Sequence, residues 1–244
     1  MNTKILTLQE KINKTLPGLD AHIAFYPLRF IKHNAEDFLN FRKSAVAVHI
    51  YPSNESSNDF SILLIERSEY EGTHSKQIAF PGGKVDPEDE SFEHTARRES
   101  FEEVAIPYDK GLLIGQLTEV NIPVSKFNVI PFVFYHEELP ELTKNKREVN
   151  EILTISLKEL LDELNKTSAM IQINKQVRLP NVPCFIIQEK IIWGATALIL
   201  NELKVICKEI WDLYKAKRGT NRNLFLFLLN HAKTIKLKNY NYEM

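Results

Sequence analysis

Three glutamates stand close together in the segment RESFEEV, residues 98–104. Glu99, Glu102 and Glu103 have the i, i+3, i+4 spacing that places side chains on one side of a helix within a single turn. Like charges at this spacing destabilise a helix by about 0.2–0.5 kcal/mol per pair. A divalent cation held by the carboxylates would offset this repulsion, so the spacing raises the question of a metal site.

The place of these carboxylates on the helix bears on that question. At about 100° per residue they fall beside Phe92, Ala96 and Ser100, and so border the face expected to pack. Close carboxylates at such a border are costly unless a cation neutralises them. Mg²⁺ and Mn²⁺ suit the role because they take carboxylate oxygens and keep water and phosphate ligands. Acidic runs are also common on solvated helix faces, so the helix alone leaves both interpretations open.

A pair of glycines precedes the acidic segment. Eight glycines occur in the chain, and Gly82 and Gly83 stand together directly before a polar loop. Glycine lets the main chain turn tightly and approach a ligand closely. A Gly-Gly turn followed by an acidic helix would frame a metal ion held against phosphates. Arg98, just before the first glutamate, is a candidate to orient one glutamate or to stabilise phosphate charge.

The acidic helix needs neighbours that position it. We expect it to begin after the N-cap Ser91, to run to about Val104 and to stop before Pro107. Asp89 and Glu90 lie just outside its positive end. The hydrophobic patterns predict a helix at 3–16, an extended lead-in at 16–30, and helices at 157–164, 195–217 and 221–233. They predict strands at 44–52 and 60–68 (a hairpin), 111–120, 127–136, 149–157, 169–173 and 184–189. This order describes mixed strands around one central helix, followed by a helical tail.

Composition excludes several classes of function. The formal net charge is −1, so the chain has no general attraction for nucleic acid or for an anionic membrane. The two cysteines, Cys184 and Cys207, are too few for a disulfide framework and sit in apolar contexts typical of the core. The first residues lack the apolar core of a signal peptide, and the apolar run at 191–200 is far shorter than the roughly 20 residues of a membrane span. We expect a cytoplasmic protein.

The segment GGKVDPEDESFEHTARRESFEEVAI, residues 82–106, resembles the Nudix box, the loop–helix signature of Nudix hydrolases. Gly83, Asp89, Arg98-Glu99, Glu102-Glu103 and Ile106 fill its fixed positions in order. The segment departs from the general pattern in three ways. Asp89 replaces a glutamate, the stretch from Asp89 to Arg98 is one residue longer, and Ala105 replaces a closing glycine. A left-handed cap at Ala105 would cost about 1 kcal/mol, which leaves open that the helix ends differently ahead of Pro107.

The first two departures are similar to the coenzyme A pyrophosphatase branch of that family. The segment LLIERSEYEGTHSKQIAFPGG, residues 63–83, also resembles the approach segment of the branch. Two positions differ, since Gly72 stands where many members have arginine and Lys76 where the branch has glycine. Segments near residues 16–29, 122–133 and 191–200 are similar to the branch at corresponding places, so the resemblance runs from about residue 16 to 200.

The resemblance implies a fold, a reaction and a set of site residues. The implied fold is an α+β Nudix-type mixed β-sheet sandwich flanked by helices, with a lead-in at 1–35, a Nudix domain at 36–200 and a helical extension at 201–244. The implied reaction is Mg²⁺- or Mn²⁺-dependent cleavage of the diphosphate of coenzyme A or its thioesters. The implied residues are Glu102, Arg98 and Glu99 for catalysis; Arg67, His74, Gln77 and Gly83 for substrate; and Glu99, Glu103, Glu102 and the Gly82 carbonyl for metal. Which glutamate would deprotonate water stays open.

Two alternatives remain at this point. The first is the same chemistry on another nucleoside diphosphate derivative, such as a dinucleotide or a nucleotide sugar. The second is a non-catalytic ligand sensor on a Nudix scaffold, against which the intact glutamate cluster argues. The expected partner is a small nucleotide, with no nucleic acid and no membrane, and a homodimer is left open.

Overall fold

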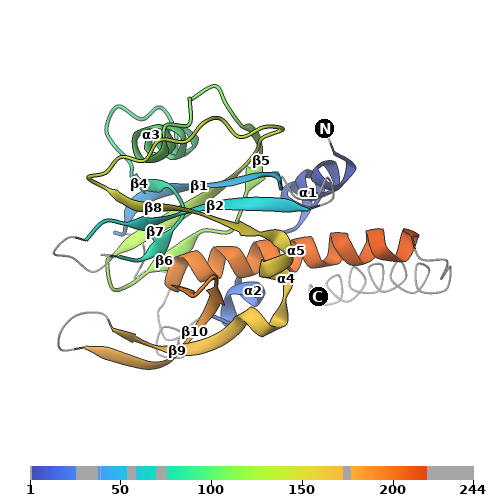
Figure 1. The fold of residues 1–244 in the computed structure, drawn as a ribbon. Helices are drawn as coiled ribbons and strands as arrows, with labels where there is room; N and C mark the ends of the chain where they lie inside the picture. The colour runs from blue at the N-terminus through green and yellow to red at the C-terminus, as the bar shows by residue number, and fades with distance from the viewer. Residues whose placement is uncertain are drawn as a thin grey trace, which may run out of the picture.

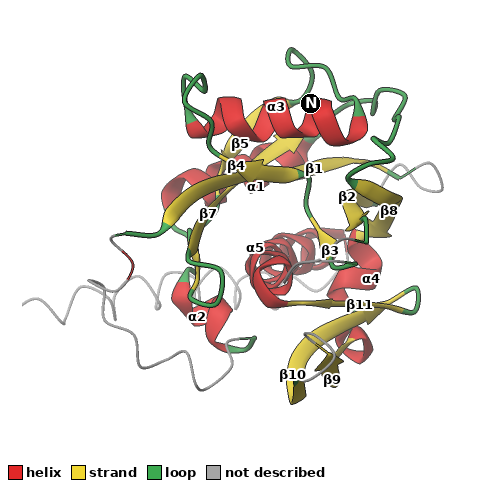
Figure 2. Cartoon of the chain, turned by 90° about the vertical axis from the view of Figure 1, so that its left-hand side faces the viewer, coloured by secondary structure: helices red, strands yellow, loops and turns green. Residues whose placement is uncertain are grey.

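A computed structural model describes residues 2–25, 38, 40–53, 59–69, 76–172 and 177–218, with the side chains of 215–218 left out. One mixed sheet forms the middle of the molecule, with helix α3 on one face and helix α5 on the other (Figure 1). A small second sheet lies beyond α5, so the layers follow one another as helix, sheet, helix and sheet (Figure 2). This arrangement confirms the expected α+β class with a mixed sheet flanked by helices.

The large sheet is built around β1. Its strands are β1 (Arg42–Pro52), β2 (Phe60–Arg67), β3 (Ile78–Ala79), β4 (Gly82–Lys84), β5 (Leu112–Gln116), β6 (Val120–Ile122), β7 (Phe127–Tyr135) and β8 (Val149–Ser156). Strand β1 pairs parallel with β7 and antiparallel with both β2 and β4. Strand β8 pairs antiparallel with β2, and β5 and β6 with β7. The predicted hairpin of β1 and β2 is confirmed by the register that joins Ile50 to Ile62.

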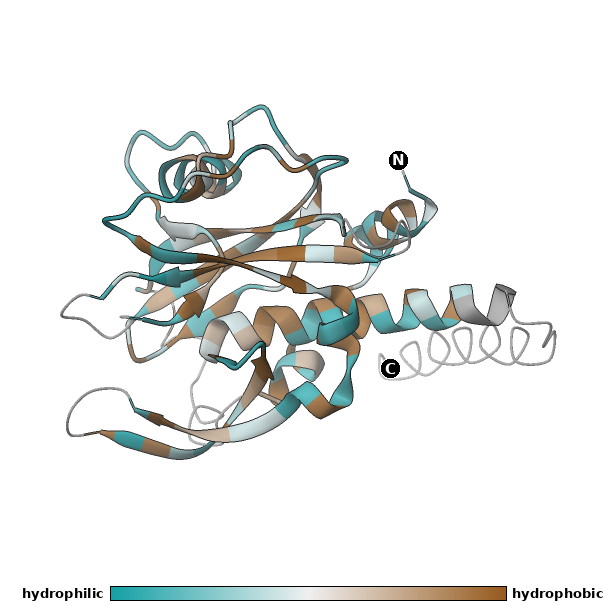
Figure 3. Cartoon of the chain, viewed as in Figure 1, coloured by the Kyte–Doolittle hydropathy of each residue, from teal (hydrophilic) through white to brown (hydrophobic). Residues whose placement is uncertain are grey.

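Both faces of this sheet are buried, because α5 packs on one face and α3 on the other. Successive side chains along a strand point to opposite faces. On β1, Val48 and Ile50 belong to the main core that α5 covers, whereas Ala45 and Ala47 belong to a smaller cluster under α3. The alanines leave room for the helix, and Ala96 of α3 packs there. The strands and the first half of α5 are accordingly hydrophobic, while the loops around α3 are hydrophilic (Figure 3).

The other elements surround α5, which spans Gly194–Arg218. They are α1 (Thr3–Lys14), α2 (Leu19–Ile23), α4 (Leu157–Leu161), a 3₁₀ turn at Glu163–Asn165, and the small sheet of β9 (Lys166–Gln172), β10 (Arg178–Ile187) and β11 (Lys190–Trp193). Residues 219–244, which include the helix predicted at 221–233, lie outside the described residues. Helix α5 runs through residue 200, and the three-part division of the chain stays a prediction. Within the described residues, no helix combines the length and the apolar run that a membrane crossing needs.

The lead-in segment differs from its prediction. Residues 16–30 were expected to be extended, but α2 occupies part of them. Tertiary contacts account for this helix, because the Glu202 carboxylate accepts from the Gly18 N–H at 3.1 Å and the Asn201 amide donates to the Ala21 carbonyl at 2.6 Å. Both partners lie on α5, far away in the sequence, so local pattern gave no sign of the helix.

The Gly-Gly turn also differs from its prediction. Gly82 and Gly83 lie in strand β4, which pairs with β1 through Val46 and Ala45. A Cβ on Gly82 would lie 2.6 Å from the Cα of Val46, so only glycine lets the two main chains come this close. The short strand fixes the glycines against the sheet more firmly than a free turn would.

Candidate functional site

Helix α3 (Phe92–Val104) carries the acidic cluster, and its predicted bounds are confirmed. The hydroxyl of Ser91 accepts from the His94 N–H at 3.0 Å, as an N-cap does. At the other end Ala105 adopts the left-handed conformation (φ 62°, ψ 28°). The suggestion that the helix ends differently here is therefore wrong, and the left-handed cap persists without glycine. A residue of the loop between β7 and β8 contributes to the cap, since the N–H of Asn145 donates to the Glu103 carbonyl at 2.9 Å.

Arg98 is the centre of a charged network beside the helix. Its Nε and one Nη donate to the two oxygens of Asp89 at 2.9 and 3.0 Å. Its other Nη donates to Glu99 at 3.0 Å and to Glu102 at 3.1 Å, and a further bond reaches the Lys84 carbonyl at 3.0 Å. These contacts engage all five N–H groups of the guanidinium. Arg98 therefore orients glutamates, and none of its donors is left for a phosphate in this arrangement.

Asp89, which was predicted to lie just outside the positive end of the helix, also binds Arg98. Its side chain is 1% exposed, and it also accepts from the Thr95 hydroxyl at 2.8 Å. The hydrogen bond from Arg98 is the main cause that holds the pKa of Asp89 well below its usual range. Asp89 is thus ionised and locks Arg98 in place.

Glu103 is the most deeply buried of the three glutamates, with 1% of its side chain exposed. It accepts from the N–H of Gly82 at 2.9 Å, and the Arg67 guanidinium lies 3.5 Å away. Burial raises the pKa of Glu103 to about 8, since these two partners only partly offset the loss of water. A carboxyl with such a pKa would gain from a neighbouring cation.

Glu99 lies next to Glu103 and directly over Gly83. A Cβ at Gly83 would overlap the Glu99 carboxylate, so the glycine makes room for it. Burial raises the pKa of Glu99, and the Arg98 charge opposes that rise. Glu102 differs, since 47% of its side chain is exposed and its partner is Arg98.

Glu148 is a further carboxylate that the sequence reasoning missed. It precedes β8, and its charge raises the pKa of both Glu99 and Glu103. Its carbonyl accepts from the Ser68 N–H at 2.8 Å, which fixes this part of the loop beside β2. Nothing local in the charged stretch KNKREVN distinguishes Glu148, and only the pairing of β2 with β8 brings it here.

Three of the four residues predicted to contact substrate lie around one cavity. Arg67, Gln77 and Gly83 all line one cavity of about 460 Å³. His74 lies outside the described residues, as does Gly72. Lys76 has φ 57°, a conformation that favours glycine, the residue that the branch has at this position. The Lys76 ammonium pairs with Glu69 at 2.8 Å.

The carboxylates suit a hard divalent cation by their chemistry and their burial. Among the described residues, no three His, Cys, Asp or Glu side chains are gathered closely enough to hold a metal ion. Glu99 and Glu102 instead point to Arg98, and Glu103 to Gly82. A cation would compete with these partners and would relieve the repulsion among Glu99, Glu103 and Glu148. The donors fit the ion, although they are not arranged around one.

Comparison with known proteins identifies the same family as the resemblance of residues 82–106, over more than half of the chain. Residues 41–175 match the family model described as the NUDIX domain. A protein of Photorhabdus laumondii named "Uncharacterized Nudix hydrolase NudL" is 34% identical over 143 residues, which are 59% of this chain and 75% of that protein. A protein of the same name from Yersinia pestis is 34% identical over 165 residues, which are 66% of this chain and 78% of that protein. The crystal structure of a MutT protein from Methanosarcina mazei covers 68% of this chain and 96% of its own, with 21% identity and a TM-score of 0.43.

Proposed function

The chain belongs to the Nudix hydrolase family, and on that premise we propose that it is a metal-dependent pyrophosphohydrolase of coenzyme A or its thioesters. The observation that carries the proposal is the juxtaposition of Glu99 and Glu103 beside Gly83. Two carboxylates with burial-raised pKa values contact Gly82 and Gly83, and these glycines line the same cavity as Arg67. Such groups favour a cation at the place where a diphosphate would enter.

Glu99 and Glu103 would hold a Mg²⁺ or Mn²⁺ ion, with the Gly82 carbonyl as a further ligand. Glu102 would serve either as another ligand or as the group that deprotonates water. When bound, the ion supplies charge that screens the diphosphate and lowers the pKa of a bound water. Arg98 keeps Glu99 and Glu102 in position, and Asp89 in turn keeps Arg98 in position. Arg67 is the cation that faces both Glu103 and the cavity, so it would steady the phosphate nearest the buried glutamate.

Two carboxylates are candidates for removing the proton of the attacking water. Glu102 is half-exposed and held by Arg98, and Glu148 is exposed on the opposite loop. Neither is buried as Glu103 is, so each can exchange a proton with solvent. We propose Glu102 as the base and Glu148 as the alternative, because Glu102 is fixed by a hydrogen bond to a rigid partner.

The substrate assignment rests on the resemblance of residues 63–106 to the coenzyme A pyrophosphatase branch. The expected products are adenosine 3′,5′-bisphosphate and 4′-phosphopantetheine. A panel of coenzyme A, acetyl-coenzyme A, NADH, ADP-ribose and a nucleotide sugar, incubated with Mg²⁺ and analysed by mass, tests this assignment. Turnover of NADH or ADP-ribose with coenzyme A left intact would reject it in favour of another nucleoside diphosphate derivative.

A further inference from the structure

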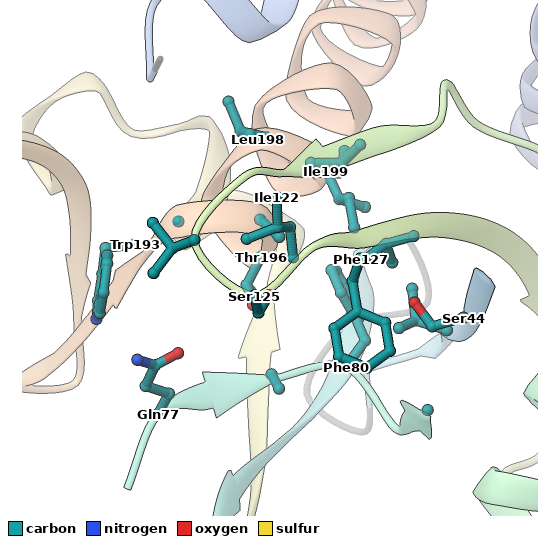
Figure 4. Close-up of a pocket in the computed structure, with 18 of the residues that line it drawn as sticks. Ser44, Gln77, Phe80, Ile122, Ser125, Phe127, Trp193, Thr196, Leu198 and Ile199 are labelled. Atoms are coloured by element: carbon teal, nitrogen blue, oxygen red, sulfur yellow. The ribbon is translucent and has the colours of Figure 1, made fainter. Parts of the chain in front are cut away.

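The cavity beside the candidate metal site is much more apolar than a nucleotide requires. Its volume of about 460 Å³ lies within the usual range for small-molecule sites. Distant parts of the chain supply the walls, among them the segment after α2, strands β1 and β4, the β6–β7 loop, the small sheet and the first turn of α5. Trp193 and Ser44 lie at opposite ends of the lining in Figure 4. Apolar lining residues include Phe80, Ile122, Phe127, Trp193, Leu198 and Ile199.

Few polar groups on these walls are free to bind a ligand. The Thr196 hydroxyl donates to the Ile78 carbonyl at 2.9 Å, and the Ser44 hydroxyl donates to the Asn128 carbonyl at 3.2 Å. Two buried lining atoms lack a hydrogen-bond partner within the described structure, the Nε of Arg67 and the hydroxyl of Ser125. The lining therefore offers a small number of polar contacts along an apolar passage.

This chemistry discriminates between the two halves of a coenzyme A molecule. The adenosine 3′,5′-bisphosphate half carries a second phosphate and a base with several hydrogen-bonding atoms, which are costly to bury without partners. The pantetheine half carries a gem-dimethyl group, one hydroxyl and two amides, so it needs few polar partners. An acyl group on its sulfur needs none.

The cavity and the candidate metal site share Gly82, Gly83 and Arg67, so a bound molecule would be continuous across both. We propose that the cavity holds the pantetheine arm together with an aliphatic acyl group, and that thioesters with such a group are preferred to free coenzyme A. This inference rests on the proposed function. The diphosphate would lie at the glycines, and the acyl group would reach the apolar walls toward Trp193 and the start of α5.

The preference can be measured as a ratio of kcat/KM values. Hexanoyl-coenzyme A is expected to exceed acetyl-coenzyme A by about tenfold or more, since each buried methylene adds to binding. Equal values for free, acetyl- and hexanoyl-coenzyme A would overturn the inference and leave the proposed function intact. Cleavage of ADP-ribose with no cleavage of any coenzyme A form would reject the proposed function itself.

A variant that fills the cavity gives a sharper test. Ala195 is half-buried on the first turn of α5 and lines the cavity, so Ala195→Leu should abolish the hexanoyl preference, bringing the kcat/KM for hexanoyl-coenzyme A down to the value for acetyl-coenzyme A in the same variant. Ala169→Leu is the matched control, because Ala169 is also half-buried but lies on β9 outside the lining, and it should keep the preference. An unchanged preference in Ala195→Leu would contradict the inference.

A binding measurement completes the test without turnover. In EDTA, the thioether S-hexyl-coenzyme A should change the fluorescence of Trp193, and Trp193→Phe should remove that change while Trp211 remains. Saturable binding with the full signal retained in Trp193→Phe would place the hexyl group elsewhere.

Discussion

The guanidinium of Arg98 donates two parallel hydrogen bonds, of 2.9 and 3.0 Å, to the carboxylate of Asp89. Such paired contacts between charged groups are stronger and more directional than single ones. Because the remaining donors of Arg98 hold Glu99 and Glu102, the position of two glutamates depends on an aspartate outside the helix. Asp89 thus holds Arg98 in position, and Arg98 in turn holds Glu99 and Glu102.

Loss of Asp89 should therefore weaken both stability and activity. Asp89→Ala leaves Arg98, whose side chain is 13% exposed, with fewer compensating charges, and we expect a loss of about 2–3 kcal/mol in the free energy of unfolding. Activity should fall by about tenfold to a hundredfold as Glu99 loses its fixed partner. Urea denaturation and steady-state kinetics measure the two effects. Asp86→Asn is the control, because Asp86 is 3.6 Å from Arg98 and largely exposed, and an equal effect there would refute the special role of Asp89.

Substitutions of Gly82 and Gly83 should have different effects, one on stability and the other on activity. Gly83→Ala would displace the Glu99 carboxylate while the backbone stays unstrained, so activity should drop about a hundredfold with the thermal midpoint nearly unchanged. Gly82→Ala would press on the main chain of Val46 and should lower the thermal midpoint by several degrees. Thermal denaturation beside activity assays separates them. Similar behaviour of the two variants would show that the glycines have the same role.

The left-handed cap at Ala105 predicts a stabilising substitution. Ala105→Gly removes the strain of a Cβ at φ 62°, and we expect a gain of about 0.5–1 kcal/mol after allowing for the more flexible unfolded chain. Urea denaturation measures this gain, and activity should not change. A loss of stability would mean that the Cβ of Ala105 contributes packing that outweighs the strain.

The buried carboxyl of Glu103 predicts how stability changes with pH in the presence of EDTA. Its pKa is about 8 in the folded protein and about 4.3 in an unfolded chain, so the folded state binds the proton more tightly. The resulting stability is complete below about pH 4.3 and is lost as the pH rises through 8. Urea midpoints at pH 5.5, 7 and 8.5 should fall in that order for the wild type. They should fall less for Glu103→Gln, and parallel curves would contradict the raised pKa.

Local sequence patterns predicted the acidic helix, its Ser91 cap and most strands, because hydrophobic periodicity and capping act over a few residues. Local patterns did not predict α2, which depends on Glu202 of α5. They also did not predict the hydrogen bonds around Arg98. Glu148 and the apolar cavity were missed for the same reason. The cavity draws Phe25, Arg67, Ile122 and Trp193 from separate elements, and no pattern along the chain links them. The roles assigned to Glu99, Glu102 and Glu103 came from the family resemblance and stay predictions.

The most direct test of the central claim compares kcat/KM for coenzyme A, with Mg²⁺ present, between the wild type and Glu103→Gln. We expect the wild type to release adenosine 3′,5′-bisphosphate and 4′-phosphopantetheine, and the variant to be folded but slower by at least about a hundredfold. Glu90→Gln, on the exposed loop before α3, should match the wild type. A folded Glu103→Gln protein that cleaves coenzyme A at the wild-type rate would contradict the claim that this buried carboxylate holds the catalytic metal.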